Sequence, residues 1–470
     1  MSEARAKVSH RVNAGTFWTI GHLTSPLFLL EVATVLLCVF GLTMVFSASS
    51  IELVMVGGDS YHTFKMQAIY MALGTVAFCV LMHAGANRFM QFKWLVGLSA
   101  LAIVLLILVL VAGKNTNGAT RWLPIGNFTL QPSEFAKITI VMACAHYVGR
   151  CAQGDIRPSV CAIRLLLPVV VPFGLIFAEK DLGTIIIIGV ALFAMLYLAG
   201  VKPRYLVGAA IVALLFVVAA ISIASYRSAR FSIWLDPESD YYGNGWQSIH
   251  GFRALASGGF FGMGLGESRQ KYAYLPEAEN DYIFAIIGEE LGFLGCMMLI
   301  GLFVFFAYCG LRIAFDARKR GDLSASLLAA SLTVLIEFQA FLNMAGVTGI
   351  LPLTGRPLPF ITAGGSSVLA CLIMAGLIAG VAQDNARDVR EGRERRRARA
   401  KQRMSVVEGG RPYQEDRVPA RPALRVPGEV VRTRPDDGRN QEEYGAREQA
   451  RQSQGPEAAE RSRRQEGSRR

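Results

Sequence analysis

The stretch LPEAENDYIFAIIGEELG, residues 275–292, decides how the chain folds. It opens a long apolar run that predicts a membrane-crossing helix. Asp281 stands at the start of that helix, and Glu289 and Glu290 follow about 12–13 Å further along it at ~1.5 Å per residue. An ionisable side chain at membrane depth costs on the order of 2.5–3.5 kcal/mol and is a functional hypothesis by default. The stretch therefore predicts a membrane helix that carries part of a functional site.

The composition is that of a protein with many membrane crossings. Of the 470 residues, 52% are hydrophobic, and the mean hydropathy is +0.37, which is too apolar for an ordinary soluble domain. We predict an all-α polytopic membrane protein with about ten transmembrane helices, because runs of about 20 apolar residues span a core of ~30 Å. The predicted spans are Pro26–Phe46, Phe64–Ala84, Trp94–Ala112, Ser133–Gly149, Arg164–Ala178, Leu182–Gly200, Arg204–Ala224, Asp281–Gly310, Ala325–Val347 and Gly364–Gln383.

The distribution of basic residues predicts the orientation. Loops rich in Arg and Lys fall on the same side as both termini, so the positive-inside rule makes the N and C termini cytoplasmic. A cleaved signal peptide is the alternative for the first span, because the SAS triplet at residues 47–49 has the small residues of a cleavage site. About twenty apolar residues are longer than a signal-peptide core, which favours an uncleaved anchor.

The chain divides into a cytoplasmic N-terminal segment (1–25), a ten-helix membrane domain (26–384) and a C-terminal tail (385–470). The tail has 23 basic and 15 acidic residues and carries +8 of the total charge of +12, which predicts a disordered cytoplasmic tail. Its basic run at residues 393–403 directly follows the last span. That position favours contact with the anionic membrane surface or a cytosolic protein over nucleic acid.

Motifs for metal, disulfide or nucleotide chemistry are missing from the sequence. The eight cysteines and six histidines lack metal-site spacing, and the long loop at 226–280 contains no cysteine. No P-loop or dinucleotide fingerprint is present. The sequence therefore predicts neither ATP hydrolysis nor a disulfide framework.

Four loops on the outer face form the walls of a predicted site. They are residues 113–132, the EKD turn at 179–181, the large extracytoplasmic loop between helices 7 and 8 at 226–280, and residues 349–363. The largest is far longer than most connections, and such loops are usually functional or disordered. Within it, Trp246, Ile249, Phe252 and Ala256 recur at near-helical spacing, which predicts a short interfacial helix.

Charged residues inside the spans have structural as well as functional interpretations. Glu134 and Lys137 share a helix face and can neutralise one another, in a structural ion pair with Ser133 as the helix cap. Glu289 and Glu290 are interpreted as partners of Lys137 or of other buried donors. Asp281 is accessible from water at its helix start, although the helix dipole alone would also favour an acid there.

Four blocks of the sequence carry a resemblance to a known family. They are GATRWLPIGNFTLQPSEFAK (118–137), EKDLGT (179–184), YLPEAENDYIFAIIGEELG (274–292) and GRPLPFITAGGSS (355–367). In this order they resemble the signature blocks of the shape, elongation, division and sporulation (SEDS) family of membrane peptidoglycan glycosyltransferases. The resemblance covers about residues 26–383 and leaves the tail outside.

The resemblance implies that the chain polymerises lipid II, an undecaprenyl-pyrophosphate-linked disaccharide pentapeptide, into glycan strands on the outer face of the bacterial plasma membrane. It also implies that Asp281 is the catalytic aspartate and that Glu134 and Lys137 line the cavity. The 274–292 block is closer to the division branch of the family than to the elongation branch. This implies septal wall synthesis with a class B penicillin-binding protein transpeptidase, and with other division proteins that the tail could bind.

The chemistry of glycosyl transfer suggests roles for further residues. A base must take the proton of the acceptor hydroxyl, and the departing pyrophosphate needs a positive environment. Asp281 suits the first role, and Glu179 and Asp181 are supporting residues with Glu289 and Glu290. Arg121, Lys137 and Arg356 suit the second role, and a divalent cation, Mg or Mn, is a further candidate although no cofactor is certain. The backbone at Gly364, Gly365 and Ser366 suits phosphate, with a tight helix entry as the alternative.

The chain departs from the family pattern, and other functions stay open. Arg356 replaces a usually apolar residue, Lys180 replaces a proline, and Glu279 could share the work of the base. A lipid II flippase or transporter also fits ten helices with intramembrane charges, but we find no inverted repeat and no paired broken helices. An elongation-type polymerase and a non-catalytic scaffold are the remaining alternatives.

Overall fold

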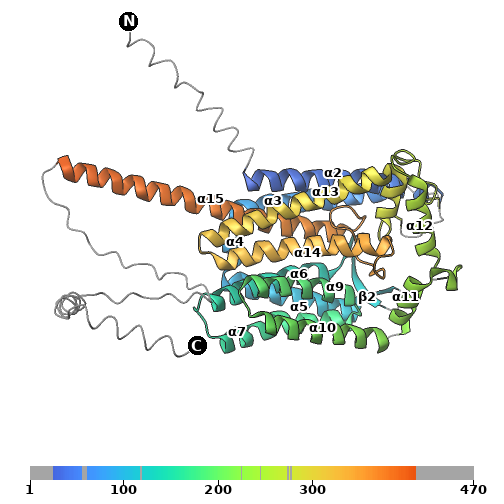
Figure 1. Cartoon of the computed structure of the whole chain (residues 1–470), viewed down its shortest axis with the longest axis horizontal. Helices are drawn as coiled ribbons and strands as arrows, with labels where there is room; N and C mark the ends of the chain where they lie inside the picture. The colour runs from blue at the N-terminus through green and yellow to red at the C-terminus, as the bar shows by residue number, and fades with distance from the viewer. Residues whose placement is uncertain are drawn as a thin grey trace, which may run out of the picture. The chain divides into compact units, whose positions relative to one another are not determined.

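The structure is a computed structural model that describes residues 25–55, 61–116, 119–126, 128–223, 225–243, 245–272, 275 and 278–408. Most of the predicted N-terminal segment and residues 409–470 of the predicted tail lie outside the described residues. The described part is a bundle of helices with a small group of strands at one end (Figure 1).

Nine long helices and one composite helix make up the described bundle. They are α2 (Pro26–Met55), α3 (His62–Ala84), α5 (Phe92–Ala112), α6 (Pro132–Ala152), α9 (Leu182–Leu198), α10 (Pro203–Ile223), α13 (Ile283–Lys319), α14 (Leu323–Val347), α15 (Gly365–Glu408), and the run α7 (Pro158–Leu165), η1 (Leu166–Val170) and α8 (Val171–Ala178). Eight of these runs are long and apolar enough to cross a membrane, as predicted for a polytopic protein. The other two are α9, with 17 residues, and α6, which carries buried charges.

Shorter elements cover the two ends of the bundle. At one end lies α4 (Ala86–Phe89). At the other end are β1 (Lys114–Thr116), β2 (Ala119–Ile125), β3 (Phe128–Leu130), α11 (Ser225–Leu235), η2 (Pro237–Asp240) and α12 (Trp246–Gly258). The strands pair antiparallel in the order β1-β2-β3. The short helix predicted from residues 246–256 is confirmed as α12, whereas α11 was not predicted.

The predicted span Asp281–Gly310 is present as α13, but it begins at Ile283 and is not one continuous helix. The helix breaks at Gly292, which has a φ of 67°. The amides of Phe293 and Leu294 donate instead to the carbonyls of Gly259 and Phe260, at 2.9 and 3.1 Å. A Cβ at Gly292 would lie 2.3 Å from a backbone nitrogen of the opposing loop, so the close approach requires glycine.

The segment that precedes the break is enclosed by protein. Every residue from Tyr282 to Glu290 is buried, so this short helix has no lipid-facing side. On its outer side it packs against α12, where Gly258 approaches the carbonyl oxygen of Gly288 so closely that a Cβ would overlap it. The acids at its end therefore lie inside the protein.

The last span continues past the predicted start of the tail. We predicted that the tail begins at Asn385, but α15 remains helical to Glu408. Arg, Ala, Glu and Lys dominate this extension and are strong helix formers. Arg395 and Glu391 lie one turn apart, with 3.4 Å between the guanidinium and carboxylate atoms. Residues 385–408 are therefore helical in the structure.

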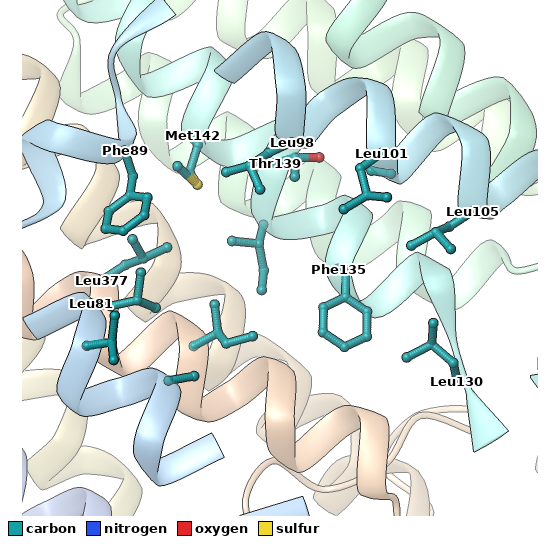
Figure 2. Close-up of a pocket in the computed structure, with 15 residues that line it drawn as sticks. Leu81, Phe89, Leu98, Leu101, Leu105, Leu130, Phe135, Thr139, Met142 and Leu377 are labelled. Carbon is teal, nitrogen blue, oxygen red and sulfur yellow. The ribbon is translucent and has the colours of Figure 1, made fainter. Parts of the chain in front are cut away.

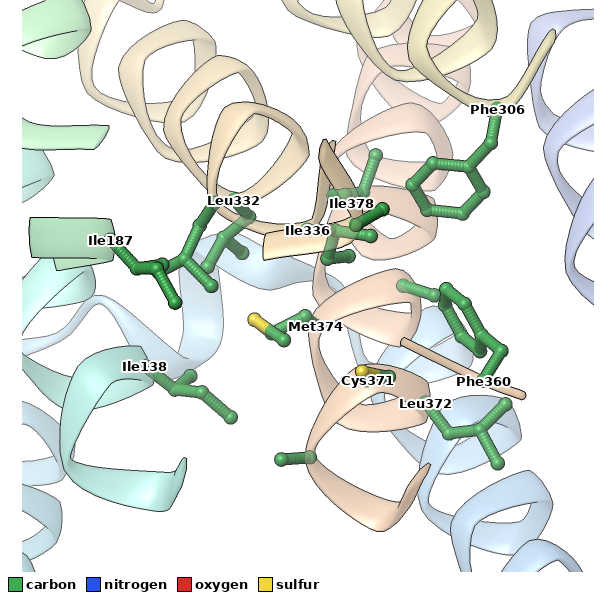
Figure 3. Packing of buried hydrophobic residues seen from close by; sticks show 14 of the residues in the cluster. Ile138, Ile187, Phe306, Leu332, Ile336, Phe360, Cys371, Leu372, Met374 and Ile378 are labelled. Atoms are coloured by element: carbon green, nitrogen blue, oxygen red, sulfur yellow. The ribbon is translucent and has the colours of Figure 1, made fainter. Parts of the chain in front are cut away.

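The bundle is centred on α14 and α15, which are the most buried spans. Figure 3 shows side chains of α13, α14 and α15 meeting there, among them Phe306, Ile336 and Ile378. Phe360, from the loop before α15, packs on Phe306 with ring centroids 5.6 Å apart. This core holds the outer loops that carry the site.

An apolar groove of about 420 Å³ lies beside the core, lined by α3, α5, α6 and α15 (Figure 2). Phe89 lies near one end and Leu130, from β3, near the other. Val80 and Leu101 are each more than half exposed at its sides, so the groove opens toward the surrounding lipid in a membrane.

Candidate functional site

A buried polar cluster lies where α6, α9, α14 and the loop before α15 meet. Its members are Glu134, Lys137, Asp181, Gln339 and Arg356, each at most 3% exposed. The Lys137 ammonium lies 2.7 Å from Glu134 Oε2, as predicted from their spacing, and donates to Gln339 Oε1 at 2.6 Å. We predicted Ser133 as the helix cap, and this was wrong. The cap position of α6 is Gln131, and no side chain caps the helix.

Arg356 joins the second half of the cluster. Its Nη1 donates to Asp181 Oδ2 at 2.7 Å and also to Thr184 Oγ1, while Nη2 lies 3.9 Å from Glu134 Oε1. Gly183 makes room for this side chain, since a Cβ there would lie 2.9 Å from Arg356 Cδ. Two acids and two bases therefore share one buried site, which keeps each charge paired.

The EKD turn positions the acids from α9. Asp181 caps α9 by accepting from the Thr184 amide at 3.2 Å and from its hydroxyl at 2.8 Å. Burial raises the pKa of Asp181, but Arg356, Arg121 and the two hydrogen bonds from Thr184 together lower it by more, so its pKa is below the ordinary value. Burial, with the Asp181 charge second, raises the pKa of Glu179 to about 8.

Glu179 therefore differs from Asp181, the other acid of the EKD turn, in the direction of its pKa shift. Its side chain is fully buried, and neither carboxylate oxygen has a hydrogen-bond partner within the described part of the chain. Arg121, from β2, reaches the turn and donates to the Lys180 carbonyl at 2.7 Å. Lys180 adopts a φ of 60°, which turns the chain between the two acids.

Asp281 lies at the outer edge of this site. Its backbone carbonyl accepts from Asn343 Nδ2 at 3.0 Å. Asn343 is 20 residues from the start of α14, or about 30 Å along it, so Asp281 lies where α14 has crossed the thickness of a membrane core. Asp281 is partly exposed, and its access from water stays a prediction.

Arg230 is a neighbour of Asp281 that the sequence did not indicate. A Cβ added at Gly355 would lie 3.2 Å from Arg230 Nη1 and 3.4 Å from Asp281 Oδ2, so both side chains reach the same glycine. Arg230 belongs to α11 and also donates to the Leu353 carbonyl at 3.4 Å. Its position depends on α11, which was predicted as loop.

The entry to α15 is tightly packed. Ser366 Oγ donates to the Thr129 carbonyl at 2.8 Å and accepts from the Gln131 amide at 3.1 Å. A Cβ at Gly365 would overlap the ring of Tyr70. These contacts favour the tight helix entry as the reason for Gly365 and Ser366, and a phosphate role for them and for Gly364, which is partly exposed, stays a prediction.

Glu289 and Glu290 belong to a second, separate cluster. Glu289 accepts from Ser257, Ser268 and the amides of residues 269 and 270. Glu290 lies 3.0 Å from the Lys271 ammonium and accepts from Ser47 Oγ. We predicted that Glu289 and Glu290 pair either with Lys137 or with other buried donors. The structure shows the second of these alternatives.

The structure thus brings most of the predicted residues together. Glu134, Lys137, Asp181 and Arg356 form one cluster, Arg121 and Glu179 adjoin it, and Asp281 is linked to it through Asn343. Sequence reasoning missed four residues that organise these sites, namely Arg230, Lys271, Gln339 and Asn343. Gln339 and Asn343 carried a signal, because they are amides four residues apart in a span whose one charged residue is Glu337.

Comparisons with known proteins place the chain among membrane proteins of the bacterial cell cycle. The FtsW/RodA/SpoVE family, described as "Cell cycle protein", matches residues 28–387. The probable peptidoglycan glycosyltransferase FtsW of Trichlorobacter lovleyi is 37% identical over 345 residues, which cover 73% of this chain and 89% of that protein. Stage V sporulation protein E of Bacillus subtilis is 35% identical over 366 residues, covering 77% and 98%.

Solved structures share the fold. One, titled "Structural coordination of polymerization and crosslinking by a peptidoglycan synthase complex", aligns with a TM-score of 0.59 and 26% identity, covering 76% of this chain and 97% of that one. The rod shape determining protein RodA of Thermus thermophilus aligns with a TM-score of 0.54 and 24% identity, covering 76% and 96%. The predicted polytopic fold is therefore confirmed.

Proposed function

The chain belongs to the FtsW/RodA/SpoVE family of cell cycle proteins, and we propose from this premise that it is a multi-pass membrane glycosyltransferase that polymerises lipid II into peptidoglycan strands for septal wall synthesis. The observation that carries the proposal is the position of Asp281, partly exposed at the level where α14 has run about 30 Å. A carboxylate at the boundary of water and hydrocarbon can act on a lipid-linked sugar.

We assign Asp281 as the base that takes the proton of the acceptor hydroxyl. Arg230 lies beside it and is exposed, which suits it to the charge that develops on the departing pyrophosphate. Arg356 and Lys137 are already paired with acids in the buried cluster, so their first contribution is to fix the walls of the site. Arg121 is partly exposed beside them.

The apolar groove supports a substrate with a hydrocarbon tail. Two of its lining residues, Leu130 and Phe135, flank Gln131 and Glu134 of the polar region. A ligand with an apolar tail in the groove would therefore present its head group next to the buried charges. This juxtaposition suits a lipid-linked sugar better than a soluble nucleotide sugar.

A divalent cation would shield the pyrophosphate if one is bound. Among the described residues, no group of three or more His, Cys, Asp or Glu side chains forms a metal-binding set. We derive no step through a metal and assign the positive environment to the arginines.

We propose a class B penicillin-binding protein transpeptidase as the partner, at the division septum of the plasma membrane. The proposal is supported by relatives named FtsW and by the structural neighbour whose title joins polymerisation with crosslinking. A fluorescent fusion that concentrates at midcell would support it. An even distribution along the lateral wall would favour an elongation-type polymerase instead.

The decisive experiment compares strand formation by wild type, Asp281→Asn and Glu238→Gln in liposomes supplied with lipid II, with and without the transpeptidase. Glu238 is an exposed acid of the same large loop and serves as the matched control. We expect strands from wild type and from Glu238→Gln and none from Asp281→Asn, with lipid II binding retained. Normal polymerisation by Asp281→Asn would refute the assignment. Lipid II transport without strands in any protein would support the flippase alternative.

A further inference from the structure

Two amide side chains on α14 form a ladder beneath the proposed active site. Gln339 and Asn343 are four residues apart and therefore lie on one face of the helix. Both are 1% exposed. A polar side chain in a membrane helix is costly unless it is hydrogen-bonded, so this pair calls for a specific explanation.

Each amide holds one carbonyl of the loop before α15. Gln339 Nε2 donates to the Pro357 carbonyl at 2.9 Å, and Asn343 Nδ2 donates to the Arg356 carbonyl at 2.9 Å. The loop at residues 352–358 has no regular secondary structure. Side-chain donors from α14 therefore supply fixed points that a helix or strand would otherwise provide.

Each amide also reaches a second residue of the site. Gln339 Oε1 accepts from the Lys137 ammonium at 2.6 Å, and the second hydrogen of Asn343 Nδ2 goes to the Asp281 carbonyl at 3.0 Å. Gln339 therefore connects Lys137 to the loop, and Asn343 connects Asp281 to the same loop. The two loop carbonyls that are held belong to Arg356 and its neighbour Pro357.

We propose that Gln339 and Asn343 are positioning residues that set the spacing between Asp281 and the cations of the buried cluster. The inference rests on the proposed function, because it assigns these amides a role in the reaction of that site. Neither amide contacts the Asp281 carboxylate through a hydrogen bond that would make it a catalytic group. Asn343 acts through the backbone of Asp281, at the point where the loop and the short helix of α13 meet.

The test needs a control variant that loses the same kind of hydrogen bond, from an asparagine amide to a backbone carbonyl, far from the site. Asn385 provides it, because this buried asparagine of α15 donates Nδ2 to the Ile313 carbonyl at 3.3 Å. Asn343→Leu and Asn385→Leu both replace an amide with an apolar group of similar size and leave backbone carbonyls without their donor. Both are expected to lower thermal stability.

Only Asn343→Leu is expected to slow the reaction. We expect kcat for strand formation to fall about 100-fold with KM for lipid II within about threefold of wild type, since a displacement of about 1 Å in a reacting group can have this effect. For Asn385→Leu, both constants should stay within about threefold of wild type. Equal kcat values for the two variants, or a rise in KM alone, would overturn the proposal.

A second measurement does not depend on catalysis. Hydrogen exchange of the purified full chain should accelerate in both 278–282 and 352–358 for Asn343→Leu, and in neither segment for Asn385→Leu. If the wild type makes no strands, the proposed function fails while this measurement still tests the ladder. Should Asn343→Leu not fold, Asn343→Asp keeps the shape but replaces the donor with an acceptor. Unchanged exchange in that variant would refute the ladder.

Discussion

Replacing Lys271 with methionine tests whether the Glu-Glu pair holds the large loop. The Lys271 ammonium donates to Glu290 Oε1 at 3.0 Å, to the Gly266 carbonyl at 2.6 Å and to the Ser47 carbonyl at 3.3 Å, which uses all three hydrogens. Both ionic side chains are at most 1% exposed. Lys271→Met therefore leaves a buried carboxylate without its counter-charge.

The expected magnitude follows from this burial. Removing one partner of a buried ion pair costs about 3–5 kcal/mol, because the remaining charge stays desolvated. At about 1.4 kcal/mol per factor of ten, the loop should open about 100- to 4,000-fold more often. The double variant Lys271→Met/Glu290→Gln should recover most of the loss, because it removes both charges and keeps an amide for the Ser47 hydroxyl to contact.

Protease cleavage between residues 259 and 280 of the purified protein measures this opening, provided that the loop opens and closes faster than it is cut. Lys319→Met is the matched control. Its ammonium lies 3.6 Å from Asp316 but is 77% exposed, so its loss should cost less than about 1 kcal/mol. Cleavage of Lys271→Met no faster than that of Lys319→Met, or no recovery in the double variant, would refute the reasoning.

Three further changes test other parts of the structure. Gly292→Ala should lower the free energy of unfolding by about 1–3 kcal/mol, and the thermal midpoint with it, because Gly292 (φ 67°, ψ −165°) adopts a backbone conformation that is essentially restricted to glycine, whereas Gly301→Ala in open space on the same helix should not. Glu179→Gln should remove a pH dependence: because burial raises the pKa of Glu179 to about 8, its stability contribution is full below the ordinary carboxyl pKa and is lost as pH rises through 8. The thermal midpoint of the wild type minus that of Glu179→Gln should therefore decrease as the pH rises from 5 to 9. A difference that stays constant over this range would contradict the prediction. Arg356→Gln should destabilise the protein more than Arg121→Gln in the same melting assay, since Arg356 is buried with its acids and Arg121 is partly exposed, and equal losses would contradict this.

Eight of the ten membrane spans were predictable because each is long and apolar. The predicted starts at Pro26 and Leu182 agree with the structure, and most other ends differ by a few residues. The break at Gly292 was not predictable in the same way, because Glu and Leu before it favour a continuous helix. The helix ends there because a distant loop supplies carbonyl and amide partners, and that is a tertiary effect.

The site was predictable only where its contacts are local. Glu134 and Lys137 are three residues apart, so helix periodicity alone places them together. Asp181 and Arg356 are separated by 175 residues, and no pattern in one sequence pairs them. The role of Asn343 was hidden for a related reason, because its partners are backbone carbonyls, which leave no trace in the side-chain sequence.

Asp281 differs from Glu134, Glu289 and Glu290 in what surrounds its side chain. Glu134 and Glu290 are buried against cations, and Glu289 is buried against hydroxyl and amide donors, so the surrounding protein already uses their charge. Asp281 is partly exposed, and the bond from Asn343 holds its backbone rather than its carboxylate. A base must reach the proton that it removes, so accessibility separates Asp281 from these buried acids. Further along the chain, Glu290 of α13 is instead paired with Lys271 of the large loop, whose ammonium lies 3.0 Å away.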